Sequence, residues 1–523
     1  MSAVTTPIDE FLRRQQDMSA VEHFATLHDA GTVDLHAGWY RTLLPASPPG
    51  PGQQYRFEVD MDACTACKAC VSACHSLNGL DDDEAWRSVG TIAGFDTGGP
   101  TQQTVTTACH HCVEPACLEG CPVDAYDKDP ITGIVAHLDD QCIGCSYCTW
   151  TCPYDVPVFN ERLGVVRKCD MCRGRLAEGE APACVQACPN GAIAIGVVDV
   201  DDARELAAPG TQLVPGAADS ALTTPTTVYR RRDPLTLAAQ ADDDWLIEPG
   251  HHHTPLVGML VATQVAVGAT AATAVALVVG GAPVFGTTAT LGVASTLTLG
   301  GIAASVGHLG RPLQAWRAVL GVGHSWLSRE IVAFGAFAPA AVAATVTVAA
   351  PAAVPIAAVP ITGPAATSIA GALGLAAVGC SAMIYIFTGR SWWAADRTAS
   401  AFAITTLVGA GLAHPLALAA AAAVALANER RLDATAPEPS ASIARGPLAP
   451  VRRRSRRARL AAGALGLAAA AAPAGFATGA LLGAGVAAAV VGEVAERSVF
   501  FQAMRGPRMP GKNLAEVRKE AAA

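Results

Sequence analysis

Sixteen of the seventeen cysteines in this 523-residue chain lie between Cys64 and Cys188, and they recur in four groups of four. The groups are Cys64, Cys67, Cys70 and Cys74; Cys109, Cys112, Cys117 and Cys121; Cys142, Cys145, Cys148 and Cys152; and Cys169, Cys172, Cys184 and Cys188. The first 50 residues are polar and charged, with no apolar segment after Arg13 and Arg14, so we expect this region to fold in the reducing cytoplasm. Disulfides are disfavoured there, and metal ligation is the expected role of the cysteines.

The spacing within the groups indicates iron–sulfur clusters. The first and third groups read C-x2-C-x2-C-x3-C, in which three close cysteines surround one cluster and the fourth ligates its neighbour. A proline follows the last cysteine of groups two, three and four and turns the chain away from the cluster. Structural zinc is the alternative, but zinc sites usually combine two C-x2-C pairs from separate knuckles. Sixteen ligands therefore predict four [4Fe–4S] clusters.

Crossed ligation also predicts which cysteines share a cluster, because each cluster takes its fourth ligand from a partner group. Groups two and three are adjacent in the sequence and form one pair. Groups one and four lie on either side of them in the sequence and form the other pair. The predicted sets are a first quartet (Cys64/Cys67/Cys70/Cys188), a second quartet (Cys169/Cys172/Cys184/Cys74), a third quartet (Cys109/Cys112/Cys117/Cys152) and a fourth quartet (Cys142/Cys145/Cys148/Cys121). Four clusters in one small domain form a path for electrons rather than a catalytic site.

The cysteine groups predict a double ferredoxin-like domain at residues 55–200, after an N-terminal extension at residues 1–54, with short strands at Ile131–Leu138 and Ala192–Val197. The stretch CIGCSYCTWTCPYDVP, followed by RKCDMC, closely resembles the four-cluster electron-transfer subunit of dimethyl sulfoxide reductase-type molybdoenzymes. Cys145 stands where some relatives, such as the nitrate reductase β subunit, carry Trp and hold a three-iron cluster, so the resemblance implies four complete cubes. His75 follows Cys74 where the other groups have proline; we expect a local backbone difference there and no lost ligand.

The second half of the chain has the composition of a membrane domain. Residues 1–255 contain 36 of the 45 acidic residues and 16 of the 36 basic residues, a net charge of −20, whereas residues 256–523 carry +11. A helix needs about 20 apolar residues to cross a bilayer. Uncharged runs of suitable length occur at residues 256–279, 287–307, 331–350, 366–387 and 401–427. A longer run at residues 460–491 predicts either two short helices or one kinked helix.

Polar motifs between these runs carry a second resemblance. HLGRP (308–312), SWLSRE (325–330), CSAMIY (380–385) and the terminal ERSVFFQAM and RMPG are similar to the membrane anchor subunit of the same family, which ordinarily is a separate polypeptide. The resemblance implies a fusion of the two subunits. The predicted fold is α+β, with the double ferredoxin-like domain, a linker at residues 201–255, an all-α polytopic transmembrane bundle of about seven or eight helices at residues 256–497, and a tail at residues 498–523.

The order of segments predicts the orientation in the plasma membrane. The cluster domain precedes the first apolar run, so we expect it on the cytoplasmic side. Positive-inside counting favours the same side for Arg452–Arg459 (RRRSRRAR). Five preceding helices would put this run outside and six would put it inside. This count predicts either an additional crossing upstream or the eighth helix that anchors of this family usually have. At the membrane entry, His251–His253 is expected to be an interfacial polar cap, with a metal-binding tract as the alternative.

His308 and Glu330 are the candidate residues for oxidation of a membrane quinol. Ionisable residues at the borders of membrane helices are costly and tend to be functional, and His308 ends the second run while Glu330 begins the third. A quinol releases two electrons and two protons, and histidine titrates in the range that proton acceptance requires. In anchors of this family the HLG histidine lies at the quinol site, which supports His308 by resemblance. Helix capping is the alternative for His308, and Arg311 and Arg329 either anchor the interface or hold Glu330.

These features predict a membrane-anchored electron-transfer subunit of a respiratory complex, with a candidate quinol site and no substrate chemistry of its own. The resemblance implies a molybdopterin catalytic partner facing the first and second quartets, and the fourth quartet nearest the quinone. The alternatives are a redox-driven ion-translocating subunit, which would need several charges inside its helices, or a conduit for a different dehydrogenase. No haem is expected, because His414 has no opposing histidine deep in the membrane, and no nucleic-acid partner is expected for so acidic a domain.

Overall fold

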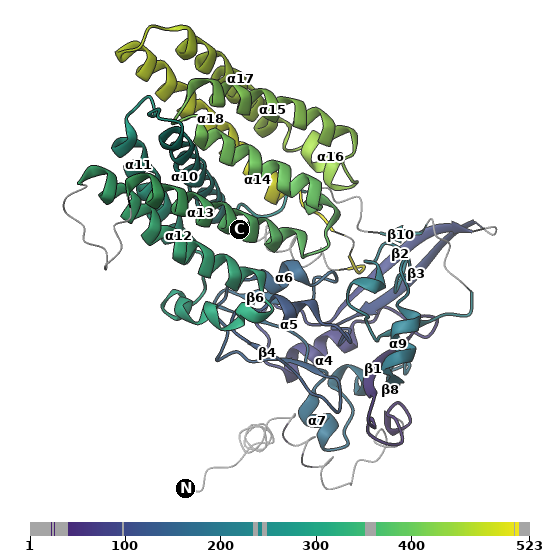
Figure 1. Ribbon diagram of the computed structural model, residues 1–523. Coiled ribbons are helices and arrows are strands. Elements are labelled where there is room, and N and C mark those ends of the chain that lie inside the picture. The colour runs from purple at the N-terminus through teal and green to yellow at the C-terminus, as the bar shows by residue number, and fades with distance from the viewer. Residues whose placement is uncertain are drawn as a thin grey trace, which may run out of the picture.

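The structure, a computed structural model, describes residues 40–96, 99–233, 239–242, 248–350, 362–506 and 508–511, together with residues 22 and 26. Most of the expected N-terminal extension, including Arg13 and Arg14, and residues 512–523 of the expected tail lie outside the described residues. Figure 1 shows a part built of strands and short helices below a bundle of long helices. This arrangement confirms the predicted α+β class, in which a cysteine-rich domain precedes a helical bundle.

Two small sheets frame the cysteine-rich domain. In the first, β1 (Gln53–Asp60) pairs antiparallel with β8 (Ile193–Asp199) and parallel with β9 (Val228–Arg230). In the second, β2 (Ser88–Asp96) lies between β3 (Gly99–Thr107) and β10 (Gln240–Ala241). Strands β9 and β10 belong to residues 201–255, which the sequence indicated to be a linker. That expectation is wrong in part, because both strands form backbone hydrogen bonds with strands of the cysteine-rich domain.

Two hairpins and a set of short helices carry the cysteines. The hairpins are β4 (Tyr126–Lys128) with β5 (Val135–His137), and β6 (Val158–Asn160) with β7 (Val165–Arg167). The helices are α4 (Ala69–Leu77), α5 (Ala116–Gly120), α6 (Tyr147–Thr151), α7 (Arg173–Ala177) and α8 (Ala183–Gln186), followed after β8 by α9 (Val200–Leu206) and the 3-10 helix η1 (Ser220–Leu222). The strand expected at Ile131–Leu138 is shorter than predicted, because its first residues form a turn in which the amide of Gly133 donates to the carbonyl of Asp129.

In the described part of the chain, eight helices of at least 16 residues form the bundle. They are α10 (Thr254–Val278), α11 (Thr287–Val306), α12 (Trp326–Ala349), α13 (Gly363–Ile386), α14 (Ala395–Ala410), α15 (Pro415–Ala434), α17 (Ala449–Ala471) and α18 (Phe476–Gln502). Five of them, α10 to α13 and α18, are long and apolar enough to cross a membrane. The shorter η2 (Pro312–Gly323), η3 (Ser391–Trp393) and α16 (Ser440–Arg445) lie in the connections.

Two of the expected apolar runs are each divided between two helices. The run at residues 401–427 breaks before Pro415, which starts α15 because its fixed φ suits a first helical position. His414 caps this helix, its Nδ1 accepting the amide of Leu416 at 3.2 Å. His414 therefore lies in a turn, whereas the uncharged run at residues 401–427 predicted a single helix with His414 in its middle, and that prediction is wrong. The run at residues 460–491 forms the end of α17 and most of α18, the first of the two predicted alternatives.

The chain reverses at each connection, so alternate loops lie at the cysteine-rich domain. The loop after α11 contacts that domain through Gly310, and the loop after α13 contacts it through Arg390. At the opposite end of the bundle, the amide of Val284 after α10 donates to the carbonyl of Ala413 after α14. The turn before Pro415 supplies the additional reversal that the arginine run required. It places the start of α17, with Arg452–Arg459, at the end of the bundle that faces the cysteine-rich domain.

The bundle contains buried charges that its apolar composition concealed. Arg459 of α17 forms an ion pair with Glu493 of α18 at 2.8 Å, and Glu493 also accepts a hydrogen bond from Thr405 of α14 at 2.8 Å. Arg497 of α18 donates to the amide oxygen of Gln264 of α10 at 2.9 Å. Arg459, Glu493 and Arg497 are all buried. The pairing of Arg459 with Glu493 follows from the cost of an unpaired charge in an apolar interior.

Candidate electron-transfer site

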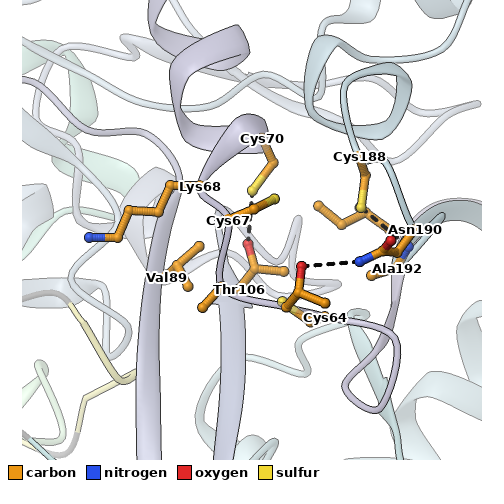
Figure 2. Close-up of a pocket in the computed structure, with 12 residues that line it drawn as sticks. Cys64, Cys67, Lys68, Cys70, Val89, Thr106, Cys188, Asn190 and Ala192 are labelled. Carbon is orange, nitrogen blue, oxygen red and sulfur yellow. Dashed lines mark hydrogen bonds between the residues drawn. The ribbon is translucent and has the colours of Figure 1, made fainter.

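The first quartet surrounds one hollow of about 310 Å³ between the start of α4 and the loop before β8. Figure 2 shows Cys70 reaching this hollow from α4 and Cys188 from the opposite loop, with Thr106 next to Cys70 and Asn190 next to Cys188. The third quartet lines a second hollow of about 360 Å³, together with His110, Lys168 and Pro153.

The second and fourth quartets also gather from distant parts of the chain. Cys74 lies within electrostatic reach of Cys172 and Cys184, and Cys169 lies within reach of Cys74 and Cys184. The fourth quartet forms in the same way, since Cys121 interacts with its three partners in group three. The structure thus brings together the members of each of the four predicted quartets, although they are separated by up to about 120 residues in the sequence.

Residues in the left-handed region of φ turn the cysteine loops inward. Ala66 and Lys68 have φ values of 58° and 59°, and Gly144 and Ser146, at the corresponding places of group three, have 68° and 56°. Such residues reverse the chain between successive cysteines, so that their thiols face the same hollow. The same geometry directs backbone amides at sulfur: the amide of Gly144 lies 3.4 Å from the Sγ atom of Cys142.

The Cys-Pro segments present the last thiol of each group in a common way. Helices α5 and α6 end immediately before Cys121 and Cys152. The amide of Ala125 then donates to the Sγ atom of Cys121 at 3.3 Å, and in group four the amide of Ala192 donates to the Sγ atom of Cys188 at 3.3 Å. Hydrogen bonds of this kind stabilise thiolates and influence the reduction potential of a cluster.

Cys74 is presented differently, as expected from the histidine that follows it. Helix α4 continues through Cys74 and His75 to Leu77 because no proline interrupts it. The side-chain amide of Asn78, at the end of the helix, lies 3.5 Å from the Sγ atom of Cys74. The backbone therefore differs from that of the other three groups, while Cys74 still joins its quartet.

The geometry of the quartets suits a cube better than a single ion. Within the described ranges, no three cysteine, histidine or carboxylate side chains converge on a point where one metal ion would bind. A [4Fe–4S] cube offers a separate iron to each of four thiolates, so its ligands surround it without converging. Burial raises the pKa of Cys74 to about 12 and that of Cys121 to about 11. Bare thiols would stay protonated there at neutral pH, and bound iron supplies the positive charge that favours thiolates.

The helical bundle docks directly on the fourth quartet. The amide of Gly310, after α11, donates to the carbonyl of Gly144 at 3.2 Å, and the amide of Gly321, in η2, donates to the carbonyl of Pro122 at 3.0 Å. Apolar side chains close the contact: Leu309, Ala318 and Ile331 from the bundle pack with Cys121, Cys142 and Cys148. The fourth quartet is therefore in contact with the segments that carry His308 and Glu330, the loop after α11 and the start of α12.

His308 lies on the loop after α11, and its ring has one nitrogen free to accept a proton. Its Nδ1 atom contacts the carbonyl of Ser305. A carbonyl only accepts, so Nδ1 carries the hydrogen and Nε2 is the basic nitrogen. Burial lowers the pKa of His308 below its ordinary value, which keeps the ring neutral at pH 7. The neighbouring His253 has a pKa lowered to about 4 by burial, and it packs edge-on against Trp150 of α6 with ring centroids 5.1 Å apart.

Glu330 lies near the start of α12, close to Tyr147 of α6. It is buried, and it lies beside Ser381 of α13 and within electrostatic reach of Tyr147 of α6. The hydroxyl of Tyr147 donates to the carbonyl of Ile384 on α13 at 2.7 Å. Among the described residues, the hydrogen bonds and ion pairs do not join His308 to Glu330. Both residues instead lie near α6, the helix that contains Cys148: Glu330 is close to Tyr147, and His308 is close to His253, which packs on Trp150.

The two arginines near these residues act as anchors, and neither pairs with Glu330. Arg311 donates to the carbonyl of Asp139 at 2.7 Å and so ties the loop after α11 to the cysteine-rich domain. Arg329 lies over the ring of Trp326, 4.5 Å from its centroid, and donates to carbonyls at the end of η2.

Sequence reasoning missed Tyr147, Trp150 and Arg390 as residues of this region. Tyr147 and Trp150 lie three residues apart on one short helix inside a cysteine group. That spacing places them on one face, but only the docking of the bundle shows that this face meets the membrane helices. His253 stands at the N-cap position of α10, and its half-buried ring also packs against the rings of Trp150 and Phe501, a contact that the sequence did not indicate.

Comparisons with known proteins divide the polypeptide between the cysteine-rich domain and the helical bundle, as the structure does. Residues 101–198 match the family described as a 4Fe-4S dicluster domain, and residues 247–432 match the DMSO reductase anchor subunit. The sequence is 40% identical over 154 residues to the B subunit of the anaerobic dimethyl sulfoxide reductase of Escherichia coli (strain K12), a match covering 28% of this protein and 75% of that subunit. It is 35% identical over 156 residues to the corresponding B subunit of Haemophilus influenzae, covering 28% of this protein and 76% of that subunit. It is also 34% identical over 175 residues to the hydrogenase-2 operon protein HybA of Escherichia coli O157:H7, covering 28% of this protein and 53% of that relative.

The two halves therefore have the roles that their geometry suggests. The cysteine-rich domain binds iron–sulfur clusters and transfers electrons, and the helical bundle anchors it in a membrane. The resemblance seen in the cysteine and anchor motifs is confirmed by the succession of both matches in one polypeptide. This chain belongs to the dimethyl sulfoxide reductase family, as a fusion of its iron–sulfur subunit with its membrane anchor subunit.

Proposed function

We propose that the chain passes electrons from membrane quinol to a molybdopterin catalytic subunit through four [4Fe–4S] clusters. The observation that carries this proposal is the contact between Gly310 and Gly144, which joins the loop bearing His308 to the loop bearing Cys142 and Cys145. Electrons released at the membrane thus meet the fourth quartet first. When bound, the clusters supply one-electron carriers, and each of the four quartets holds one cube.

The protons of the quinol go to side chains of the bundle. Oxidation removes two electrons and two protons. His308 accepts one proton at Nε2, which is free because Nδ1 faces the carbonyl of Ser305. Glu330 accepts the second proton as a carboxylate, or relays it. Both electrons leave through the cysteine-rich domain, one at a time.

The far end of the path is the first quartet. Its Cys67 is exposed, whereas every cysteine of the fourth quartet is buried or half-buried. An exposed ligand provides a short route to a docked partner, so the catalytic subunit is placed at this end. The arginine run of α17 lies at the end of the bundle that faces the cysteine-rich domain, and by the positive-inside rule this supports a cytoplasmic location for the clusters.

A second candidate function is a conduit for a hydrogenase or another dehydrogenase. The likeness to the hydrogenase-2 operon protein favours it, since that relative shares the cysteine-rich region at 34% identity. The two functions use the same clusters and the same membrane contact. They differ in the subunit that docks near Cys67 and in the direction of electron flow.

Isolation of the tagged protein from native membranes tests the proposal. We expect about sixteen irons per polypeptide from four cubes, a co-purifying subunit that contains molybdenum, and reductase activity with either a quinol or reduced viologen as donor. His308→Arg should abolish the quinol-driven activity and leave the viologen-driven activity, because arginine stays protonated and cannot accept a proton. A nickel-containing partner would favour the second function. Stoichiometric zinc in place of iron would refute both.

A further inference from the structure

Arg390, between α13 and η3, is a buried cation of the membrane domain that reaches into the cysteine-rich domain. Its side chain is only 6% exposed. The Nε atom donates to the carbonyl of Trp150 at 2.9 Å, and Nη2 donates to the carbonyls of Thr149 and Cys152, each at 3.2 Å. These carbonyls belong to the end of α6, whose last turn leaves them without partners inside the helix.

Helix α6, whose end Arg390 binds, connects two quartets. Cys148, within α6, belongs to the fourth quartet, and Cys152, at the end of the helix, belongs to the third. An electron that moves from the membrane into the domain passes between these two quartets. The guanidinium of Arg390 binds the backbone of the segment that joins them.

The charge of Arg390 is only partly balanced. Its Nη2 atom lies 2.8 Å from the Oδ1 atom of Asp155, whose side chain is 40% exposed. Its Nη1 atom faces the sulfur of Met504 at 3.5 Å, in an apolar part of the bundle. Water screens the field of a half-exposed carboxylate more strongly than that of a buried guanidinium, so a net positive field acts on the end of α6.

We propose that Arg390 raises the reduction potentials of the clusters in the third and fourth quartets, so that the membrane-facing pair can accept electrons from quinol. Reduction adds one negative charge to a cluster, and a fixed cation nearby stabilises the reduced form. Net charge, hydrogen bonding and solvent exposure are the means by which a protein adjusts such potentials. The inference rests on the cluster assignment of the proposed function, and it is independent of the quinol site.

Arg390 and the carbonyls that it binds come from the two different halves of the fused chain. The cation belongs to the loop after α13, whereas the carbonyls that it binds lie about 240 residues earlier. The potentials of the third and fourth quartets therefore depend on docking of the two halves, and a detached cysteine-rich domain would lack this contribution.

Mediated redox titration of the full-length protein in membranes, followed by electron paramagnetic resonance, tests this role without quinol. Arg390→Gln should shift the potentials of the third-quartet and fourth-quartet clusters to more negative values and leave the other two unchanged. Arg390→Lys should restore most of the shift because it keeps the charge. Arg445→Gln is the matched control: Arg445 pairs with Glu438 at 3.4 Å in an exposed contact of the membrane domain that involves no residue of a cysteine group.

A substitution with the opposite expected sign keeps the test decisive if Arg390→Gln does not assemble. Asp155→Asn removes the carboxylate that offsets Arg390, so the same two potentials should become more positive. Potentials that stay unchanged in variants with all four clusters assembled would overturn the proposal. Equal shifts of all four clusters would also overturn it, since they would indicate a general disturbance of the domain.

Discussion

The backbone amide of Gly310 in the membrane domain lies 3.2 Å from the carbonyl of Gly144, in the loop between Cys142 and Cys145. A side chain has no room at this junction. A Cβ atom on Gly310 would overlap the carbonyl of Gly164, and one on Gly144 would overlap the same carbonyl. Gly144 also has a φ of 68°, which glycine adopts without the cost that other residues incur. The two halves therefore meet through backbone, with the fourth quartet immediately behind the contact.

Gly310→Ala should separate the quinol site from the clusters. The added methyl group must displace the Gly164 loop, so quinol-driven turnover should fall about fivefold or more while viologen-driven turnover persists, an expectation based on about 1–3 kcal/mol for overpacking. Parallel assays of both activities in membranes provide the measurement. Gly300→Ala in α11 is the control, because a Cβ atom there meets nothing within 4 Å. Equal loss of both activities would show that the contact serves assembly instead.

Cys145→Ser should affect a single cluster. In the crossed scheme Cys145 binds only the fourth-quartet cube, which lies against the membrane domain, so electron paramagnetic resonance should show loss or conversion of that cluster alone. Quinol-driven turnover should fall, since the first carrier after the membrane is impaired. Loss of a signal from the first or second quartet would contradict the pairing.

The pH dependence of quinol oxidation should reveal His308. The neutral ring is the proton acceptor, and burial lowers the pKa of His308 below 6.5. Activity should therefore persist as the pH falls through 6.5 and decline only as the lowered pKa is crossed, because the ring is then protonated. The viologen-driven profile should lack this decline. A quinol-specific decline centred at or above pH 6.5 would conflict with the buried, neutral ring.

Breaking the ion pair between Arg459 and Glu493 should destabilise the bundle. Their side chains are 6% and 3% exposed, and removal of the cation leaves the Glu493 carboxylate buried without the charge that pairs with it. Arg459→Met should cost about 3–5 kcal/mol, seen as a lower unfolding temperature of the purified protein in detergent. Arg459→Met combined with Glu493→Leu should recover much of the loss. Arg445→Gln, which breaks an exposed pair with Glu438, should cost under about 1 kcal/mol.

Local patterns made much of this architecture predictable. The spacing of the cysteines within a group determines the conformation of the loop that carries them. Each cluster takes its fourth ligand from a partner group, which relates loops that are distant in sequence. The members of each quartet could therefore be predicted from the sequence. The membrane helices α10 to α13 were likewise evident, because a continuous apolar run of sufficient length has few alternatives in a bilayer.

Features that depend on distant contacts were not predictable. β9 contains only three residues, and it pairs with β1 about 170 residues earlier in the sequence. Because the segment around β9 has the composition of a linker, nothing in the sequence indicated this pairing. The turn before Pro415 lies in an alanine-rich stretch in which no charge marks the boundary. Arg390 has the sequence context of an ordinary interfacial arginine, and only the fold shows that it binds the end of α6.

The most direct test of the account is whether quinol reduces the clusters of this protein and whether His308 is required. The full-length protein, purified in detergent with its clusters oxidised, is mixed rapidly with a reduced quinol under anaerobic conditions, and cluster absorbance near 400 nm is followed. The account predicts that this absorbance bleaches in the wild-type protein, and that in His308→Arg it bleaches only when dithionite is added. Clusters that quinol fails to reduce in the wild-type protein, or reduces equally fast in His308→Arg, would contradict the account.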